Sequence, residues 1–221
     1  MKKNIFLVAA LFVASMVAFV GCGKDDDKGS GSTGLSSLTI SGTLEDDLSD
    51  VVKVTVFAGK EEDIFLAEGS VSGDKFSVTL DTPPASALTP ISENAEDLLN
   101  VKEITISNPN AKGTGVSIVG YDINDWEYYM SKSKQSSSLT NMTMANEGYI
   151  YVDSNVSIAG NTTVKEEVEG VPISMKVTVN MQLKKGWNII VMTMSINQDG
   201  MSIDVRTGSL SGGTWSSSSF F

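Results

Sequence analysis

Apolar and polar residues alternate with a period of two along most of this chain. The longest example runs from Ile173 to Leu183, where six apolar residues are interleaved with five polar ones. Val52–Val56 and Phe76–Leu80 repeat the pattern on a shorter scale. Because successive side chains of a strand point to opposite faces of a sheet, this pattern predicts strands with one buried face.

Turn residues separate these runs. The pairs Gly73-Asp74, Lys185-Gly186 and Asp199-Gly200 supply the positive φ angles that tight hairpins need. We therefore predict that residues 173–206 form a three-stranded antiparallel meander. Residues 131–141 are almost wholly polar and predict a loop. Further strands are predicted near 37–43, 50–58, 63–69, 74–81, 102–107, 114–122, 147–153, 161–168 and 213–220.

One segment has the features of a helix. In Ser92–Asn100 a serine can cap the first turn, acidic residues follow, and Leu98 and Leu99 can pack on a core. About ten short strands with turn signals between them, and this one short helix near 92–100, predict an all-β fold, namely an antiparallel β-sandwich. We expect one β-sandwich domain over residues 36–221, because no flexible linker interrupts it.

The first strands have a family resemblance. The stretch Ile40-Ser41-Gly42-Thr43, followed by Phe76-Ser77-Val78-Thr79-Leu80 before Pro83-Pro84, resembles the small immunoglobulin-like or prealbumin-like modules of exported bacterial proteins. The resemblance implies a β-sandwich, with 36–84 either a sub-module or one layer of a larger sandwich.

The N-terminus predicts export. Lys2 and Lys3 precede an apolar run from Ile5 to Val20 that only Ser15 interrupts, as in a secretory signal peptide. The alternative, a retained transmembrane helix, needs about 20 apolar residues, and this run has 16. We expect residues 1–21 to be removed as a signal peptide.

The end of the apolar run resembles a lipobox. Phe19-Val20-Gly21-Cys22 is similar to the site at which bacterial lipoproteins are cleaved before a cysteine that is then acylated with fatty acids such as palmitate. Cys22 is also the only cysteine, so the chain cannot form an internal disulfide. Several acyl chains on Cys22 would bind a membrane nearly irreversibly, at about 0.8 kcal/mol per buried methylene.

A polar segment follows the cysteine. Residues 22–35 contain Lys24-Asp25-Asp26-Asp27 and a Gly/Ser stretch, which together predict a lipidated N-terminus on a flexible tether. The Lys-Asp-Asp-Asp run resembles the export signal of Bacteroides-type surface lipoproteins, which implies anchorage in the outer membrane, facing the cell exterior. A solvated acidic spacer is the simpler alternative.

Composition excludes several kinds of chemistry. The chain has no histidine, which removes Ser-His-Asp and Cys-His catalysis and histidine-based zinc or copper sites. The formal net charge of −11 argues against nucleic-acid partners. We expect no catalytic residues and no obligatory cofactor.

One polar and aromatic segment, Tyr121–Tyr129, contains the candidate site residues. Asp122, Asn124, Asp125 and Glu127 offer oxygen ligands within six positions, so a calcium site is one hypothesis. A carboxylate pair of a small glycoside hydrolase is another, although such a pair needs a cleft, and solvated acids in a loop explain the segment more simply.

The aromatic residues of the same segment allow a third interpretation. Trp126, Tyr128 and Tyr129 have flat apolar faces suited to stacking on a sugar ring. Packing in or at the rim of the core is the competing and preferred interpretation for the aromatics of this chain, Tyr149, Tyr151, Trp187 and Trp215 included. The pairs Met142-x-Met144 and Met192-x-Met194 are similar to thioether copper motifs, but core filling explains them better.

These observations favour a non-catalytic, lipid-anchored surface protein that binds a glycan, a host or matrix component, or a membrane partner. The alternative is a structural adhesin or fimbria-like subunit that assembles through exposed strand edges. A small carboxylate-based hydrolase ranks last.

Overall fold

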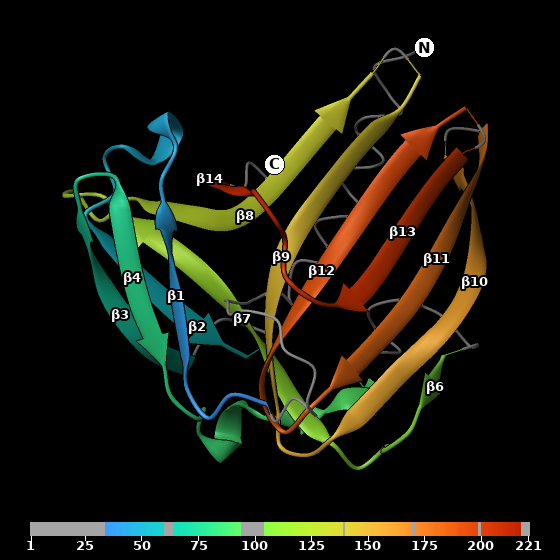
Figure 1. Ribbon diagram of the computed structural model, residues 1–221, viewed down its shortest axis with the longest axis horizontal. Helices are drawn as coiled ribbons and strands as arrows, with labels where there is room; N and C mark the ends of the chain where they lie inside the picture. The colour runs from blue at the N-terminus through green and yellow to red at the C-terminus, as the bar shows by residue number, and fades with distance from the viewer. Residues whose placement is uncertain are drawn as a thin grey trace.

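The structure is a computed structural model of the 221-residue chain, and it describes residues 34–59, 64–93, 104–138, 140–168, 171–198 and 200–217. The fold is all-β, which confirms the predicted class (Figure 1). The strands are β1 (Leu38–Thr43), β2 (Lys53–Ala58), β3 (Ile64–Ser72), β4 (Lys75–Leu80), β5 (Thr89–Pro90), β6 (Thr105–Ile106), β7 (Lys112–Tyr121), β8 (Glu127–Ser137), β9 (Met142–Val152), β10 (Val156–Val168), β11 (Val171–Leu183), β12 (Gly186–Asn197), β13 (Gly200–Thr207) and β14 (Thr214–Ser217). Two short 3₁₀ turns, η1 (Asp46–Leu48) and η2 (Ala85–Ala87), lie between strands.

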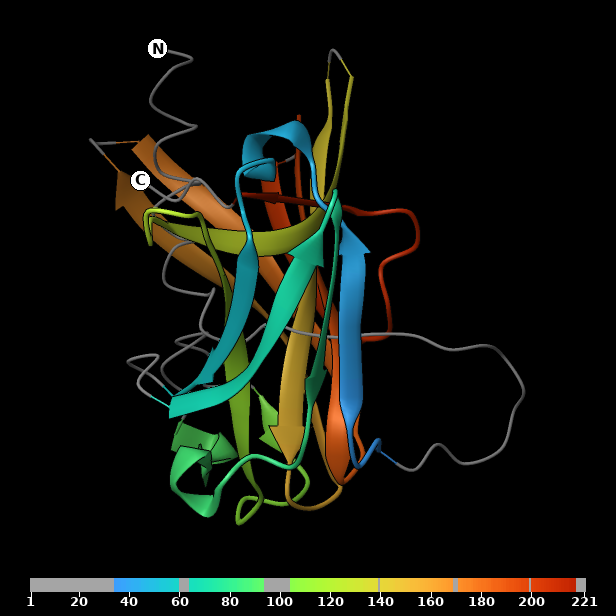
Figure 2. The same ribbon diagram turned by 90° about the vertical axis from the view of Figure 1, so that its left-hand side faces the viewer.

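The strands form one hydrogen-bonded path that folds over on itself. Its order is β1-β4-β3-β2-β7-β8-β9-β12-β13-β11-β10-β6, with β14 beside β8 and β5 beside β7. Figure 1 shows two groups of strands, β1–β4 on the left and β9–β13 on the right, with β7 and β8 between them. In Figure 2 the first group crosses in front of β9 and β12, which gives the two layers of a sandwich.

One hydrophobic core fills the space between these layers. The strand β4 shows the predicted alternation, with Phe76, Val78 and Leu80 buried and the residues between them exposed. From the other layer, Tyr149 and Trp187 reach the same cluster. Aromatic contacts tie the layers together, because Trp215 lies edge-on to Phe76, with 5.0 Å between ring centroids, and stacks on Tyr149.

A second core lies on the other face of the β9–β13 group. Val177, Val179 and Leu183 on β11 are buried in it, so the long alternating run has its predicted apolar face. Met194 is buried in this cluster and Met192 packs against it, in agreement with core filling. Methionine is suited to this role because its unbranched side chain adapts to irregular gaps.

The predicted meander over 173–206 is wrong at one of its two pairings. The strands β12 and β13 form the expected antiparallel hairpin, but β11 pairs with β13 in parallel, not with β12. The strand β13 lies between its neighbours and stops at Thr207, whose Oγ1 accepts a hydrogen bond from the N–H of Gln182 at 2.6 Å. Beyond Thr207, the side-chain amide of Asn188 bonds the backbone that follows β11. It accepts a hydrogen bond from the N–H of Lys184 and donates one to the C=O of the same residue, both at 2.7 Å.

The predicted loop over 131–141 is wrong for residues 131–137. Residues 127–137 form the strand β8, which pairs with β9 along Lys132–Ser137 and with β14 along Met130–Ser133. Serine, lysine and glutamine give this segment little intrinsic strand propensity, so the tertiary pairing with two neighbours determines its conformation.

Two other predictions are tested only at their described ends. Residues 91–93 are helical, and the rest of the predicted helix near 92–100 lies outside the described residues. The signal peptide, Cys22 and the tether also lie outside them. Within the described ranges, no helix is both long and apolar enough to cross a bilayer.

Candidate functional site

The segment singled out from the sequence forms the turn between β7 and β8. The carboxylate of Asp122 organises this turn, since its Oδ1 accepts hydrogen bonds from the N–H groups of Asn124 at 2.7 Å and Trp126 at 3.0 Å. Asp122 and Trp126 are also joined through the backbone, by a bond from N–H to C=O at 3.2 Å. Asp125 has a φ of 61°, a left-handed conformation that aspartate tolerates better than most residues. The turn is therefore held by its own polar groups.

These hydrogen bonds favour the ionised form of Asp122. The pKa of its carboxyl is lowered from the ordinary value of 3.8, chiefly because the N–H of Trp126 donates to it. Desolvation acts in the opposite direction, and the backbone and side-chain donors of Asn124 lower the pKa further. A general acid for glycoside hydrolysis needs a raised pKa, so Asp122 is shifted the wrong way for that role.

The turn exposes two large apolar side chains. Ile123 is 85% exposed and Trp126 is 70% exposed, the highest values among the exposed large hydrophobic residues of the described chain. By contrast, Trp187 and Trp215 are buried, as are Tyr149 and Tyr151. Core packing is thus confirmed for those four aromatics and wrong for Trp126.

The three aromatics proposed as one platform do not lie together. Tyr128 is half-buried and packs against the core between the layers, opposite Gly120 of β7. Tyr129 follows it in β8 and therefore points to the other face of the sheet, where it is 45% exposed. Trp126 precedes the strand, in the turn itself.

The candidate metal ligands are spread along the turn and the start of β8. Both oxygens of Asp122 accept hydrogen bonds within the turn, and Glu127 accepts one from the hydroxyl of Tyr121 at 3.2 Å. Asn124 donates to Asp122 through its amide, and Asp125 is exposed. Among the described residues no group of three or more acidic, histidine or cysteine side chains is placed to hold a metal ion. Calcium binding remains a prediction.

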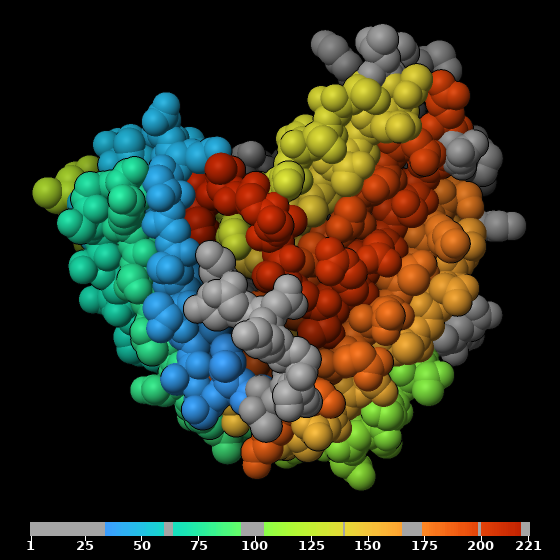
Figure 3. Space-filling view, in the orientation of Figure 1, coloured from blue at the N-terminus to red at the C-terminus, as the bar shows by residue number. Residues whose placement is uncertain are grey.

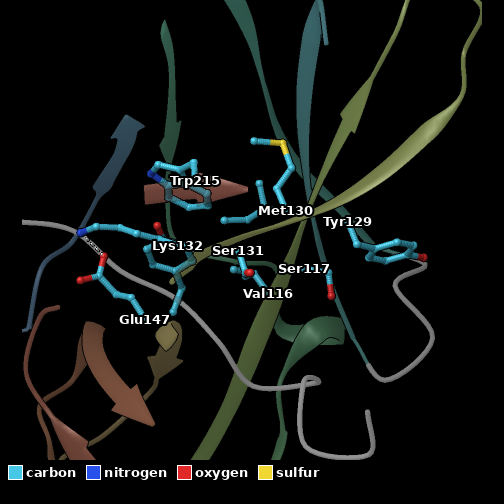
Figure 4. A pocket seen from close by; sticks show the side chains of 10 residues that line it. Val116, Ser117, Tyr129, Met130, Ser131, Lys132, Glu147 and Trp215 are labelled. Carbon is cyan, nitrogen blue, oxygen red and sulfur yellow. Dashed lines mark hydrogen bonds and ion pairs between the residues drawn. The ribbon is translucent and has the colours of Figure 1, made fainter. Parts of the chain in front are cut away.

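A small cavity lies where β7, β8 and β9 separate. The strand β7 pairs with β8 through residues 119–121 and with β9 through 113–115, while β8 joins β9 only from Lys132 onward. The opening has a volume of about 40 Å³ and is lined mainly by apolar atoms (Figure 4). A cavity of this size holds a few water molecules and cannot enclose a sugar ring.

A buried ion pair closes one side of this cavity. The Nζ of Lys132 lies 2.8 Å from Oε1 of Glu147, whose side chain is only 2% exposed. The second oxygen, Oε2, accepts the N–H of Leu210 at 2.6 Å. In Figure 4 this pair lies beside Trp215, while Tyr129 points away on the opposite side. Both charged groups are satisfied internally, so we assign them a structural role.

The β7–β8 turn lies far from the point where the chain enters the fold. Leu35 exchanges backbone hydrogen bonds with Trp187 at the start of β12, near the lower end of β1 in Figure 1. The turn lies at the upper end of the left-hand strands in Figures 1 and 2, and its atoms protrude at the left edge of Figure 3. Leu35 therefore lies at the end of the molecule opposite to Ile123 and Trp126.

The sequence interpretation passed over Ile123, which is the most exposed of these apolar residues. The sequence could have indicated its exposure, because Ile123 lies between Asp122 and Asn124 and belongs to no alternating apolar run. No known family model matches this sequence, and no curated protein matches it either. The site therefore has to be interpreted from its own chemistry.

Proposed function

We propose that this chain is a lipid-anchored protein of the outer membrane that binds a ligand outside the cell and catalyses no reaction. The observation that carries the proposal is the β7–β8 turn, which holds Ile123 and Trp126 in water on a polar scaffold. Leaving these side chains exposed costs free energy, about 1.5–3 kcal/mol for each large apolar group that a core would bury. Contiguous apolar surface on a folded protein is typical of an interaction site, and these two side chains share one short turn.

The N-terminal sequence supports the location. A signal-like apolar run, the Phe19-Val20-Gly21-Cys22 motif and the acidic tether together resemble a surface lipoprotein. Acyl chains on Cys22 would attach the domain to the membrane through its Leu35 end, and the β7–β8 turn lies at the opposite end of the molecule. The flexible tether would leave the turn free to contact a ligand in the medium or on another cell.

The location is tested with Cys22→Ala, and Ser32→Ala in the tether is the matched control. We expect the alanine variant at position 22 to retain its signal segment and to lose acylation, measured by mass spectrometry of the membrane fraction. Antibodies against the folded domain should label intact cells that carry the wild type or Ser32→Ala. Unchanged processing, acylation and labelling of Cys22→Ala would show that the anchor is not at this residue.

The binding role is tested on the mature lipoprotein in nonionic detergent micelles, against arrays of glycans and of peptides. We expect at least one array member to bind the wild type and to lose binding in Trp126→Ala and in Ile123→Ser. Phe65→Ala is the matched control, because Phe65 is also exposed, at 58%, but lies on β3. Equal loss in all three variants, or no loss in any, would refute a site at the turn.

A further inference from the structure

Three connections meet at the end of the molecule that carries the β7–β8 turn. They are residues 44–52 between β1 and β2, residues 73–74 between β3 and β4, and residues 122–126. Backbone bonds hold them together, from the N–H of Leu44 to Asp74 at 2.7 Å and from the N–H of Val52 to Tyr121 at 2.8 Å. We call this surface the distal end. Figure 3 shows the first two connections together at the upper left of the molecule.

The three connections of the distal end carry only negative charges, although Lys53 and Lys75 follow directly in β2 and β4. Residues 44–52 contain four carboxylates, 73–74 one and 122–126 two, and none of the three connections contains lysine or arginine. Within the described part of the chain, no side-chain hydrogen bond or ion pair engages the exposed carboxylates of Asp50, Asp74 and Asp125. Like charges gathered at one end of a molecule repel one another, so a positive partner would relieve an unfavourable arrangement.

Apolar side chains stand among these carboxylates. Val52, at 50% exposed, follows Asp50 and is bonded through its N–H to β7, next to the turn that exposes Ile123 and Trp126. The three side chains come from adjacent strand ends. A tryptophan and aliphatic neighbours surrounded by polar groups have the composition of a protein-binding hot spot.

The region also accommodates cations over aromatic rings. The Nζ of Lys53, the first residue of β2, lies 4.7 Å from the ring centroid of Tyr121. A partner ammonium or guanidinium group can make the same contact with the exposed face of Trp126, which is the most favourable ring type for it.

We propose that the distal end binds a cationic amphipathic peptide, or a protein segment with that character. Its apolar face would cover Val52, Ile123 and Trp126, and its lysine or arginine side chains would pair with the surrounding carboxylates. This inference rests on the proposed function and adds the chemical class of the ligand. A glycan fits less well, because only one aromatic ring lies in the turn and the Asp122 oxygens are already bonded.

The probe is a 20-residue peptide of lysine and leucine with helical amphipathic spacing, titrated into the mature lipoprotein in dodecyl maltoside micelles. Two further peptides separate the contributions, one with glutamate in place of lysine and one with the lysines but serine in place of leucine. Empty micelles give the background. Binding is measured by Trp fluorescence and by calorimetry at 50 and 500 mM NaCl.

We expect the Lys/Leu peptide to bind, the glutamate peptide not to bind, and the serine peptide to bind at least tenfold more weakly. Trp126→Ala should weaken binding about tenfold or more, as for a hot-spot residue. Asp50→Asn with Asp125→Asn should weaken it about three- to tenfold at 50 mM NaCl and less at 500 mM, because salt screens exposed charges. Asparagine also tolerates the φ of 61° at position 125.

Matched controls lie outside the distal end. Phe65→Ala removes an exposed aromatic ring. Asp81→Asn with Asp204→Asn removes one exposed charge and one partly exposed charge that is paired with Arg206. Each variant should change the affinity less than twofold. Equal binding of the lysine and glutamate peptides, or equal loss in control and distal variants, would overturn the proposal. Trp126-dependent binding of a glycan, without peptide binding, would overturn the ligand class while leaving the proposed function in place. Binding of neither probe type would overturn both.

Discussion

Removal of the buried carboxylate of Glu147 should destabilise the fold strongly, although the residue touches no ligand in the proposal above. Glu147→Ala leaves the Lys132 ammonium without its partner at 2.8 Å and the Leu210 N–H without its acceptor at 2.6 Å. Breaking a buried ion pair from one side costs about 3–5 kcal/mol. Lys132 keeps 22% of its side chain in water, so the lower end of that range applies.

The unpaired Leu210 amide adds about 1 kcal/mol, the lower end of the cost for an unsatisfied buried donor. The expected total is about 4 kcal/mol. In a domain of this size about 1 kcal/mol shifts Tm by roughly 2–4 °C, so Glu147→Ala should melt about 8–16 °C below the wild type. Circular dichroism during heating, with urea unfolding at 25 °C, measures both quantities.

A double variant separates the ion pair from general packing. Lys132→Met with Glu147→Leu removes both charges and keeps most of the volume, so it should be at least 2 kcal/mol more stable than Glu147→Ala. Glu147→Gln keeps one acceptor oxygen and replaces the other with an NH₂ donor, so its stability should fall between those of Glu147→Ala and the double variant. A loss below 0.5 kcal/mol in Glu147→Ala, or a double variant no better than the single one, would refute the assigned structural role.

Three further predictions concern positions where one contact determines the outcome. Gly42→Ala would place a Cβ 2.2 Å from Cδ1 of Trp215, so we expect the free energy of unfolding in urea to fall by about 1–3 kcal/mol. In the control Gly73→Ala the new Cβ meets no atom within 4 Å. That variant should lose less stability, through its positive φ alone. Asn188→Ala removes the amide that bonds both backbone groups of Lys184, and about 2 kcal/mol should be lost, again by urea unfolding; an unchanged midpoint would contradict the bridging role. The pKa of Asp122 is lowered, so its stabilisation of the turn should be fully present above pH 3.8 and should fade as the pH falls through the lower pKa of the folded state. The carboxyl signal of Asp122 in a ¹³C NMR titration should therefore have its midpoint below 3.8. A midpoint above 3.8 would contradict the hydrogen bonding described.

Strands with one buried face could be predicted from the sequence, and strands that are polar on both faces could not. In β4 the alternation of buried and exposed residues gave both the element and its orientation. In β8 the residues beyond Met130 are polar on both faces, and only the pairing with β9 and β14 makes them a strand. Lys132 illustrates the reason, because its charge predicts exposure and Glu147 instead holds it against the core.

The order of the strands in the sheet was harder to predict from the sequence than their positions along the chain. A two-residue connection between β11 and β12 predicts direct pairing, since short links usually join neighbours. The insertion of β13 between them is accompanied by one contact distant in sequence, the Gln182–Thr207 hydrogen bond, and by one local contact, the Asn188–Lys184 bridge. Neither contact has a local pattern that a single sequence reveals.

The structure does not bring the aromatic residues of the candidate segment together into one surface. Composition drew attention to residues 121–129, but a strand's alternation sends Tyr128 to the core and Tyr129 to the opposite face. Trp126 escapes the core because the strand begins only at Glu127, after a turn that Asp122 fixes through hydrogen bonds. The turn is thus stable without a buried side chain of its own, and Ile123 and Trp126 do not contribute to the core. Since burial elsewhere stabilises the sandwich, Ile123 and Trp126 can carry apolar groups for the proposed partner without a cost to the core.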